Sequence, residues 1–89
     1  MKPISLQVTY QNGRPFAAYI SLARRPGEKS ARSQEVAPEI VVDFARDGRP
    51  IGVEIVSPDA TPVDEILAVF DRLGLGRPDL SELAPLVAA

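Results

Sequence analysis

The sequence predicts an α+β fold, a four-stranded antiparallel β-meander of two hairpins with one face covered by a C-terminal α-helix. Three observations support this prediction. Apolar and polar residues alternate along two pairs of segments within residues 4–56. A short turn containing glycine joins the members of each pair. Apolar residues then recur at helical spacing over residues 62–73. We expect the 89 residues to form one domain.

The first hairpin is predicted on both sides of an Asn12-Gly13 turn. Its apolar residues occupy alternate positions: Ile4, Leu6, Val8, Tyr10, Phe16, Ala18, Ile20 and Leu22. Both series reach one side of the sheet if a three-residue loop, Gln11-Asn12-Gly13, joins the strands. This register places Leu6 opposite Ala18.

The second hairpin is predicted around Asp47-Gly48. Its apolar residues are Ile40, Val42, Phe44, Ile51, Val53 and Ile55. A two-residue loop brings these residues to one side and places Asp43 opposite Gly52. Because proline has no N–H to donate, Pro50 indicates that the last strand lies at an edge of the sheet, at least at that end.

The main helix is predicted over residues 62–73. Thr61 is a suitable N-cap, Pro62 suits the first helical position, and Gly74 suits the C-terminal stop. The apolar face consists of Val63, Ile66, Leu67, Phe70 and Leu73.

A second short helix is predicted in the C-terminal extension, residues 75–89. It begins near Asp79, and Glu82 three residues later completes a capping box. Its apolar residues are Leu80, Leu83 and Leu86.

Residues 23–38 are polar and are predicted to be a mobile connector. Four basic side chains gather in it, and we consider them for contact with an anion or with nucleic-acid phosphates: Arg24, Arg25, Lys29 and Arg32. No aromatic residue lies among them, and the chain carries a net charge of −2. We therefore favour a solvated loop over a nucleic-acid site.

Composition excludes several classes of site. The chain has no cysteine and no histidine, so thiol nucleophiles, disulfides and His/Cys zinc sites are absent. Residues 1–36 carry six basic against two acidic residues, and residues 37–89 carry four against ten. This asymmetry suits a complementary dimer or a charged partner. The sequence shows neither a signal peptide nor a membrane-spanning apolar run, so we expect a cytoplasmic protein.

The candidate site lies on the polar face of the predicted sheet. Its residues are Asp43, Glu54, Gly52, Tyr19 and Glu39. Asp43 and Glu54 are predicted as diagonal neighbours with Cα atoms about 7–8 Å apart, and Gly52 leaves space beside Asp43. Two carboxylates in this arrangement suit a hard cation or an acid–base pair. The alternative is a solvated or dimer-buried sheet face, and the sequence favours it.

The stretch IVVDFARDGRPIGVEI resembles the signature of a small bacterial family known as domain of unknown function 2283. Members tend to read I-V-V-D-Y-D-x-D-G-x-x-x-G-I-E-I, which is matched by Asp43, Gly48, Gly52, Glu54 and Ile55. Upstream, an apolar strand pair of the family is matched by Tyr10, Tyr19, Ile20 and Leu22. The resemblance covers about residues 6–56.

The resemblance implies a compact β-meander with a helix, and it implies no established activity. It also suggests a partner of the toxin–antitoxin kind for some members. This chain has Gln11, Phe16 and Ala45 where the family often has acids. If those acids serve a shared site, the site is incomplete in this chain.

The leading functional prediction is a non-enzymatic protein-interaction module that forms a homodimer and needs no cofactor. We expect the dimer contact at the polar sheet face or at the strand edge that bears Pro50. The first alternative is a cation-binding protein or a small carboxylate enzyme that uses Asp43 and Glu54. The second alternative is binding of nucleic acid or of a toxin partner through the basic connector.

Overall fold

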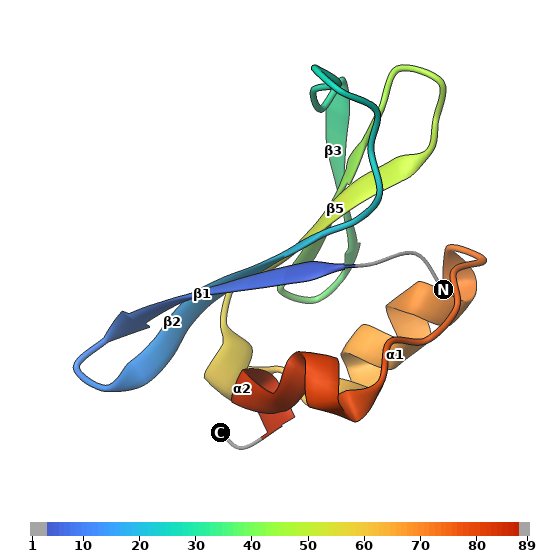
Figure 1. The fold of residues 1–89 in the computed structure, drawn as a ribbon. Helices are drawn as coiled ribbons and strands as arrows, with labels where there is room; N and C mark the ends of the chain where they lie inside the picture. The colour runs from blue at the N-terminus through green and yellow to red at the C-terminus, as the bar shows by residue number, and fades with distance from the viewer. Residues whose placement is uncertain (1–3, 88–89) are drawn as a thin grey trace.

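The structure, a computed structural model that describes residues 4–87, is an α+β fold with an antiparallel sheet (Figure 1). The α+β class and the antiparallel sheet of the prediction are thereby confirmed. The strands are β1 (Ser5–Gln11), β2 (Arg14–Ser21), β3 (Arg32–Ala37), β4 (Ile40–Phe44) and β5 (Pro50–Ile55). The helices are α1 (Val63–Arg72) and α2 (Ala84–Val87), with short 3-10 turns η1 (Pro58–Ala60) and η2 (Leu80–Leu83).

The sheet has five strands in the order β1-β2-β5-β4-β3, so the prediction of four strands is wrong. The missing strand, β3, lies inside residues 23–38, which were expected to form only a connector. β3 pairs with β4 at one edge of the sheet, and most of its side chains are exposed. Because an exposed edge strand buries neither face, its sequence, RSQEVA, needs no apolar alternation and gives no period-two signal.

β5 lies at the centre of the sheet, between β2 and β4. The prediction of an edge strand is therefore wrong for β5 as a whole, although β5 has no paired β2 residue at its Pro50 end. Pro50 is the first residue of β5, at the end that extends past the last β2 pair, Ser21 opposite Gly52. A proline is tolerated there because no ladder hydrogen bond needs its missing N–H.

The second hairpin has the predicted core register, with Val42 opposite Val53 and Asp43 opposite Gly52. Its loop is longer than two residues, because a bulge next to Asp43 pairs Phe44 with Pro50. The alternation of apolar residues thus fixes the register in the middle of β4 and β5, where one face is buried, but not at the end near the loop.

The first hairpin differs from its predicted register by two residues, since Leu6 pairs with Ile20 rather than with Ala18. Its loop is the two-residue Asn12-Gly13, and both residues have positive φ (54° and 77°). A register shift between Thr9 and Tyr10 restores the parity that the apolar series requires. The extra residue that brings both apolar series to one side thus lies in a bulge of β2 and not in the loop, where it was predicted.

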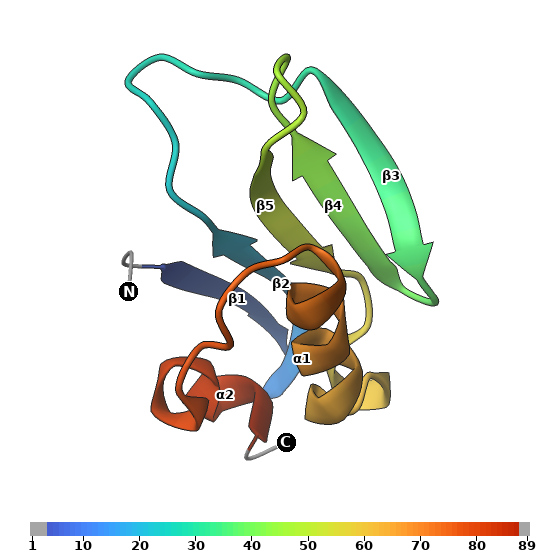
Figure 2. The ribbon, with the colours of Figure 1, turned by 90° about the vertical axis from the view of Figure 1, so that its right-hand side faces the viewer.

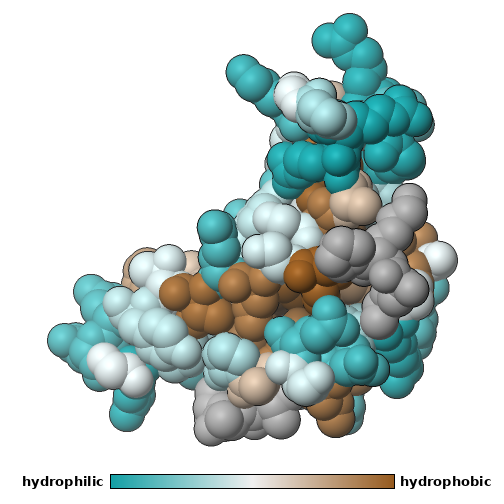
Figure 3. Space-filling model, in the orientation of Figure 1, coloured by the Kyte–Doolittle hydropathy of each residue, from teal (hydrophilic) through white to brown (hydrophobic). Residues whose placement is uncertain are grey.

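Both helices lie on the same side of the sheet (Figure 2). The surface is most hydrophobic in the region between the β1–β2 hairpin and the C-terminal helices (Figure 3). Among residues 4–86, whose burial is described, four large apolar residues are substantially exposed: Tyr10 (55%), Phe16 (58%), Val56 (41%) and Leu80 (54%). Leu80 is thus not a core residue, although the sequence analysis placed it on the apolar side of the second helix.

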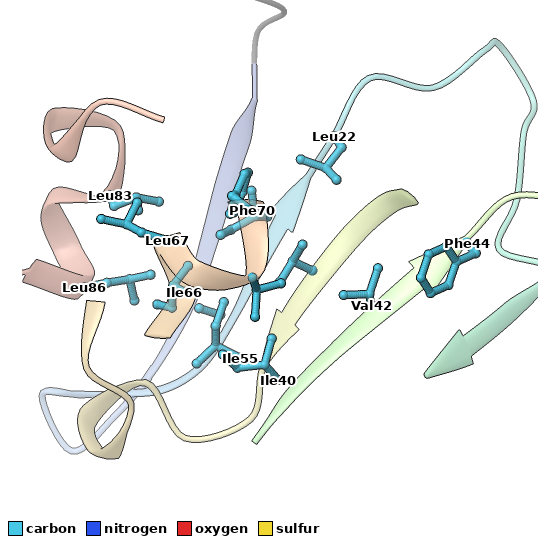
Figure 4. Packing of buried hydrophobic residues seen from close by; sticks show 14 residues of the cluster. Leu22, Ile40, Val42, Phe44, Ile55, Ile66, Leu67, Phe70, Leu83 and Leu86 are labelled. Carbon is cyan, nitrogen blue, oxygen red and sulfur yellow. The ribbon is translucent and has the colours of Figure 1, made fainter. Parts of the chain in front are cut away.

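The core combines residues of the sheet with residues of the helices (Figure 4). The sheet contributes Ala18, Ile20, Leu22, Ile40, Val42, Phe44, Val53 and Ile55, and the helical segments contribute Ile66, Leu67, Val69, Phe70, Leu83 and Leu86. Every sheet residue in this cluster was predicted to lie on the apolar side. The polar face of the sheet is consequently the face opposite this cluster.

The helix ends follow the predicted signals in part. Gly74 has a φ of 73°, and the N–H groups after α1 bond back to its last turn, as expected for a glycine stop. Thr61 is not the N-cap, because its hydroxyl donates to the carbonyl of Ser57 (2.9 Å) and stabilises η1 instead. The capping box of Asp79 and Glu82 is confirmed at the start of η2.

The segment between β2 and β3 is attached to the β4–β5 loop by charged side chains. The Arg49 guanidinium bonds to Glu28 and to Asp47 (2.7 Å), and Arg25 lies 3.9 Å from the same Asp47 carboxylate. The backbone N–H of Ala31 then donates to the carbonyl of Phe44 (2.8 Å), just before β3 begins. These contacts guide the chain across the end of the sheet, so that β3 reaches the free side of β4.

Candidate functional site

The polar face is organised in rows that cross all five strands. The register places Ser5, Ser21, Gly52, Asp43 and Ser33 in one row. The next row consists of Gln7, Tyr19, Glu54, Val41 and Glu35. Side chains directly across or diagonal within these rows are close enough to interact.

Tyr19 joins the two rows. Its backbone lies opposite Glu54, but its side chain extends along the diagonal, and its hydroxyl donates to Oδ2 of Asp43 at 2.8 Å. This hydrogen bond connects β2 to β4 across the intervening strand β5. The sequence analysis assigned Tyr19 and Asp43 to the same face, and the structure brings them into direct contact.

Gly52 provides the space that this contact needs. A Cβ atom added to Gly52 would lie 1.7 Å from the Tyr19 hydroxyl oxygen and 2.4 Å from Cζ of the same ring. The space beside Asp43 that the sequence predicted is therefore filled by Tyr19. Glycine is required because the ring passes directly over the β5 backbone.

Two further side chains complete the cluster. The Ser33 hydroxyl of β3 donates to Oδ1 of Asp43 at 2.6 Å, so both oxygens of this carboxylate accept a hydrogen bond. Arg24 donates to the Ile51 carbonyl (2.9 Å) and, at 3.4 Å, to the Tyr19 hydroxyl. We call Tyr19, Arg24, Ser33, Asp43 and Gly52 the polar-face cluster.

The environment of the cluster changes the titration of Tyr19. Partial burial, and next the hydrogen bond to the Asp43 carboxylate, raise the pKa of Tyr19 above its usual value of 10.0. Desolvation disfavours the phenolate, and the hydrogen bond to Asp43 stabilises the protonated phenol that donates it. Tyr19 is therefore held in its neutral, hydrogen-bond-donating form.

The other two predicted carboxylates stand apart from the cluster. Glu54 is exposed, and within residues 4–87 its side chain makes no hydrogen bond or ion pair. Glu39 lies in the turn between β3 and β4 with a φ of 65°, and its backbone N–H donates to Glu35 (3.4 Å). Of the three predicted carboxylates, Asp43 is thus the one that connects strands, because it accepts hydrogen bonds from β2 and β3.

The four basic residues of the predicted anion site are dispersed. Arg24 belongs to the polar-face cluster, and Arg25 is near Asp47. Arg32 lies over the Phe44 ring, with its guanidinium carbon 4.2 Å from the ring centroid, on the opposite side of the sheet from Ser33. Lys29 is exposed. Arg24, Arg25 and Arg32 thus each contact a different part of the structure.

The sequence reasoning missed Ser33 and Arg24 as partners of the candidate site. Both lie in the segment that was predicted as a connector, and only the pairing of β3 with β4 places Ser33 opposite Asp43. No local sequence pattern predicts that Ser33 lies opposite Asp43.

The hydrogen bonds of the polar-face cluster connect strands of the sheet. Within the described residues, no three acidic side chains gather closely enough to hold a metal ion. Two sizeable clefts lie elsewhere. One of about 500 Å³ is lined mainly by apolar residues, among them Leu22, Phe70 and Leu75, and the other, of about 660 Å³, lies beside Phe16 and Val56. The only charged group in the first, Arg49, already binds Asp47 and Glu28.

No helix in residues 4–87 has the length and apolar character needed to span a membrane.

No curated protein and no solved structure shows significant similarity to the chain. One family model matches residues 17–57, a little under half of the chain, and the match includes every residue of the polar-face cluster. Over these residues the chain resembles the family described as Protein of unknown function (DUF2283), as its sequence signature predicted.

Proposed function

We propose that this chain is a non-enzymatic protein-interaction module that acts as a homodimer. In this proposal α1 shields the apolar face of the sheet, and the remaining surface serves contact with other protein. The observation that carries the proposal is the exposure of Tyr10 (55%) and Phe16 (58%) on the same hairpin. Exposed aromatic residues are enriched in protein interfaces, and a chain of this length gains stability by burying them.

The state of Asp43 supports a non-enzymatic role. Its two oxygens each accept a hydrogen bond, from Tyr19 and from Ser33, and Asp43 lines neither of the two clefts described above. A catalytic carboxylate needs access to the proton that it abstracts. Asp43 instead connects three strands of the sheet.

The dimer is tested by sedimentation velocity over a series from low to high micromolar concentration. We expect the weight-average mass to rise from that of one chain to that of two, and Phe16→Ala to shift this transition to higher concentration. Ala17→Ser, on the same strand, serves as a control that removes no aromatic surface. A strict monomer throughout the series contradicts the proposal.

The rival cation-binding role of Asp43 and Glu54 has its own test. Titration with millimolar Mg²⁺, Mn²⁺ or Ca²⁺ should leave the amide NMR signals of both residues unchanged, because within the described residues no third acidic side chain joins them to complete a cation site. Saturable shifts confined to these two positions would support the rival role instead.

A further inference from the structure

The two edges of the sheet differ in how they are protected. β3 carries the charged residues Arg32 and Glu35, has a register break after Glu35, and is followed at once by Pro38. Charges, bulges and prolines are the features that keep edge strands from pairing with other chains. β3 is therefore a protected edge.

β1 has none of these features. Its seven residues, SLQVTYQ, include no charge, no proline and no glycine. The bulge of the first hairpin leaves its extra residue in β2, so Ser5–Thr9 stay in regular register. β1 is also rich in residues that favour strands, with Val8, Thr9 and Tyr10 in succession. Its outer row of backbone N–H and C=O groups is thus open to pairing.

We infer that a second copy of this chain docks at β1 by antiparallel pairing of β1 with β1, which joins the two sheets into one continuous sheet. The inference rests on the proposed homodimer and names its surface. Strand addition of this kind satisfies the backbone groups of both edges at once, and a two-fold axis makes the contact self-limiting.

The strand is self-complementary about its middle residue. Full overlap of Ser5–Gln11 with its copy places the axis at Val8, so that Val8 faces Val8 of the second copy. Leu6 then faces Tyr10 on the core side, and Gln7 faces Thr9 on the polar side. Apolar residues meet apolar residues, polar residues meet polar residues, and no like charges are opposed.

The apolar surface along this edge supports the same docking. Leu6 and Val8 are only half-buried where they pack against the core, and Tyr10, the next residue in the same alternation, is 55% exposed. The hydrophobic region between the hairpin and the helices borders this edge (Figure 3). Pairing with a second β1 extends the apolar layer across the axis and covers the outer flanks of these side chains.

Charge on the polar side of β1 gives the sharpest test, because Gln7 and Thr9 are exposed and make no side-chain hydrogen bond within residues 4–87. In the variant Gln7→Lys with Thr9→Lys, like charges face each other twice across the axis. In the matched variant Gln7→Lys with Thr9→Glu, opposite charges do. We expect the dimer of the first variant to dissociate about tenfold more readily than that of the second.

A cysteine probe provides a second measurement, since the chain has no native cysteine. Under mild oxidation, Val8→Cys should form a disulfide-linked dimer, whereas Gln34→Cys on the protected edge should stay unlinked. The circular dichroism spectrum and melting temperature of each variant are compared with those of the wild type, so that unfolding is not mistaken for dissociation.

The outcomes separate the inference from the proposed function. If the wild type dimerises but both charge variants dissociate alike and Val8→Cys does not link, the dimer uses another surface, such as the polar face, and the β1 inference is wrong. Linking through Gln34→Cys instead would assign the contact to β3. If the wild type is a monomer, both the homodimer and its β1 interface are rejected.

Discussion

The β1–β2 hairpin and the β3–β4–β5 half of the sheet are stabilised in different ways. From Ser5 to Ala18, no side chain makes a hydrogen bond or an ion pair within the described residues. From Tyr19 onward, the polar-face cluster and the charged contacts of Arg49 connect strands and loops. The family match begins at residue 17, near the same boundary.

The part of the sheet from Tyr19 onward is therefore specified by particular polar pairs, whereas residues 5–18 depend on the backbone ladder and on apolar packing. Polar pairs fix geometry because a partly buried acceptor is costly to leave unpaired. The segment of residues 5–18, which has no such pairs, tolerates changes on its surface. It is thus the part of the molecule best suited to present a docking edge.

The largest expected effect comes from the core that both halves share. Phe70 is 1% exposed, and Phe70→Ala should lower the free energy of unfolding by about 3–5 kcal/mol. Phe16, on the hairpin, is 58% exposed, and Phe16→Ala should change that free energy by less than about 0.5 kcal/mol. Urea denaturation at a concentration where the protein is monomeric compares the two. Equal losses would show that Phe16 packs in the core after all.

The next effect concerns Asp43. Asp43→Ala leaves the Tyr19 and Ser33 hydroxyls without their acceptor, and we expect a loss of about 2 kcal/mol in the free energy of unfolding. Glu54→Ala, on the same face but without a partner, should cost less than about 0.5 kcal/mol. Chemical denaturation measures both. If the two substitutions cost the same, the cluster is not a stabilising unit.

Gly52→Ala is expected to cost about 1–2 kcal/mol, because the new methyl group displaces the Tyr19 ring and breaks its bond to Asp43. In a Tyr19→Ala background the ring is absent, so the same substitution should cost close to nothing. This double-mutant cycle isolates the contact between the ring and the strand. Additive costs in the cycle would mean that the strain at Gly52 has another source.

The smallest effect is the pH dependence of Tyr19. Since the folded state raises the pKa of Tyr19 above 10.0, it keeps the proton where the unfolded chain releases it. The stability that the neutral phenol contributes is fully present below the unfolded-state pKa of 10.0 and is lost as the pH rises through the folded-state pKa. Wild type should therefore lose more stability than Tyr19→Phe between about pH 9 and about pH 11, whereas Tyr10→Phe should match the wild type. Parallel losses in all three would remove the special role of Tyr19.

Much of the fold could be predicted because its signals are local. Alternation in β4 and β5 identified the buried residues Val42, Val53 and Ile55, and it placed Asp43 opposite Gly52. A glycine with positive φ ends α1, and the capping box starts η2, as the sequence indicated. Each of these features depends on residues that lie close together in the sequence.

The candidate site could be predicted only in part. The face that Tyr19 and Asp43 share follows from strand parity, which is a local property. Their hydrogen bond depends on β5 lying between β2 and β4, and this arrangement was not the one expected. Arg24 and Ser33 were assigned to a connector, because β3 has no apolar alternation to reveal it.

From the sequence alone, most of the buried residues, the glycine that ends α1, the capping box of η2 and the polar face of the sheet could be predicted, whereas Phe16 and Leu80 were placed on the apolar side and are exposed. These properties follow from side-chain hydrophobicity at periods of two and 3.6 residues and from the conformational freedom of glycine. Only the tertiary structure decided that β3 occupies the free side of β4, that β2 pairs with β5, and that Tyr19 crosses Gly52 to reach Asp43. Pairing between distant segments depends on how the whole chain closes and packs, and no window of neighbouring residues contains that information.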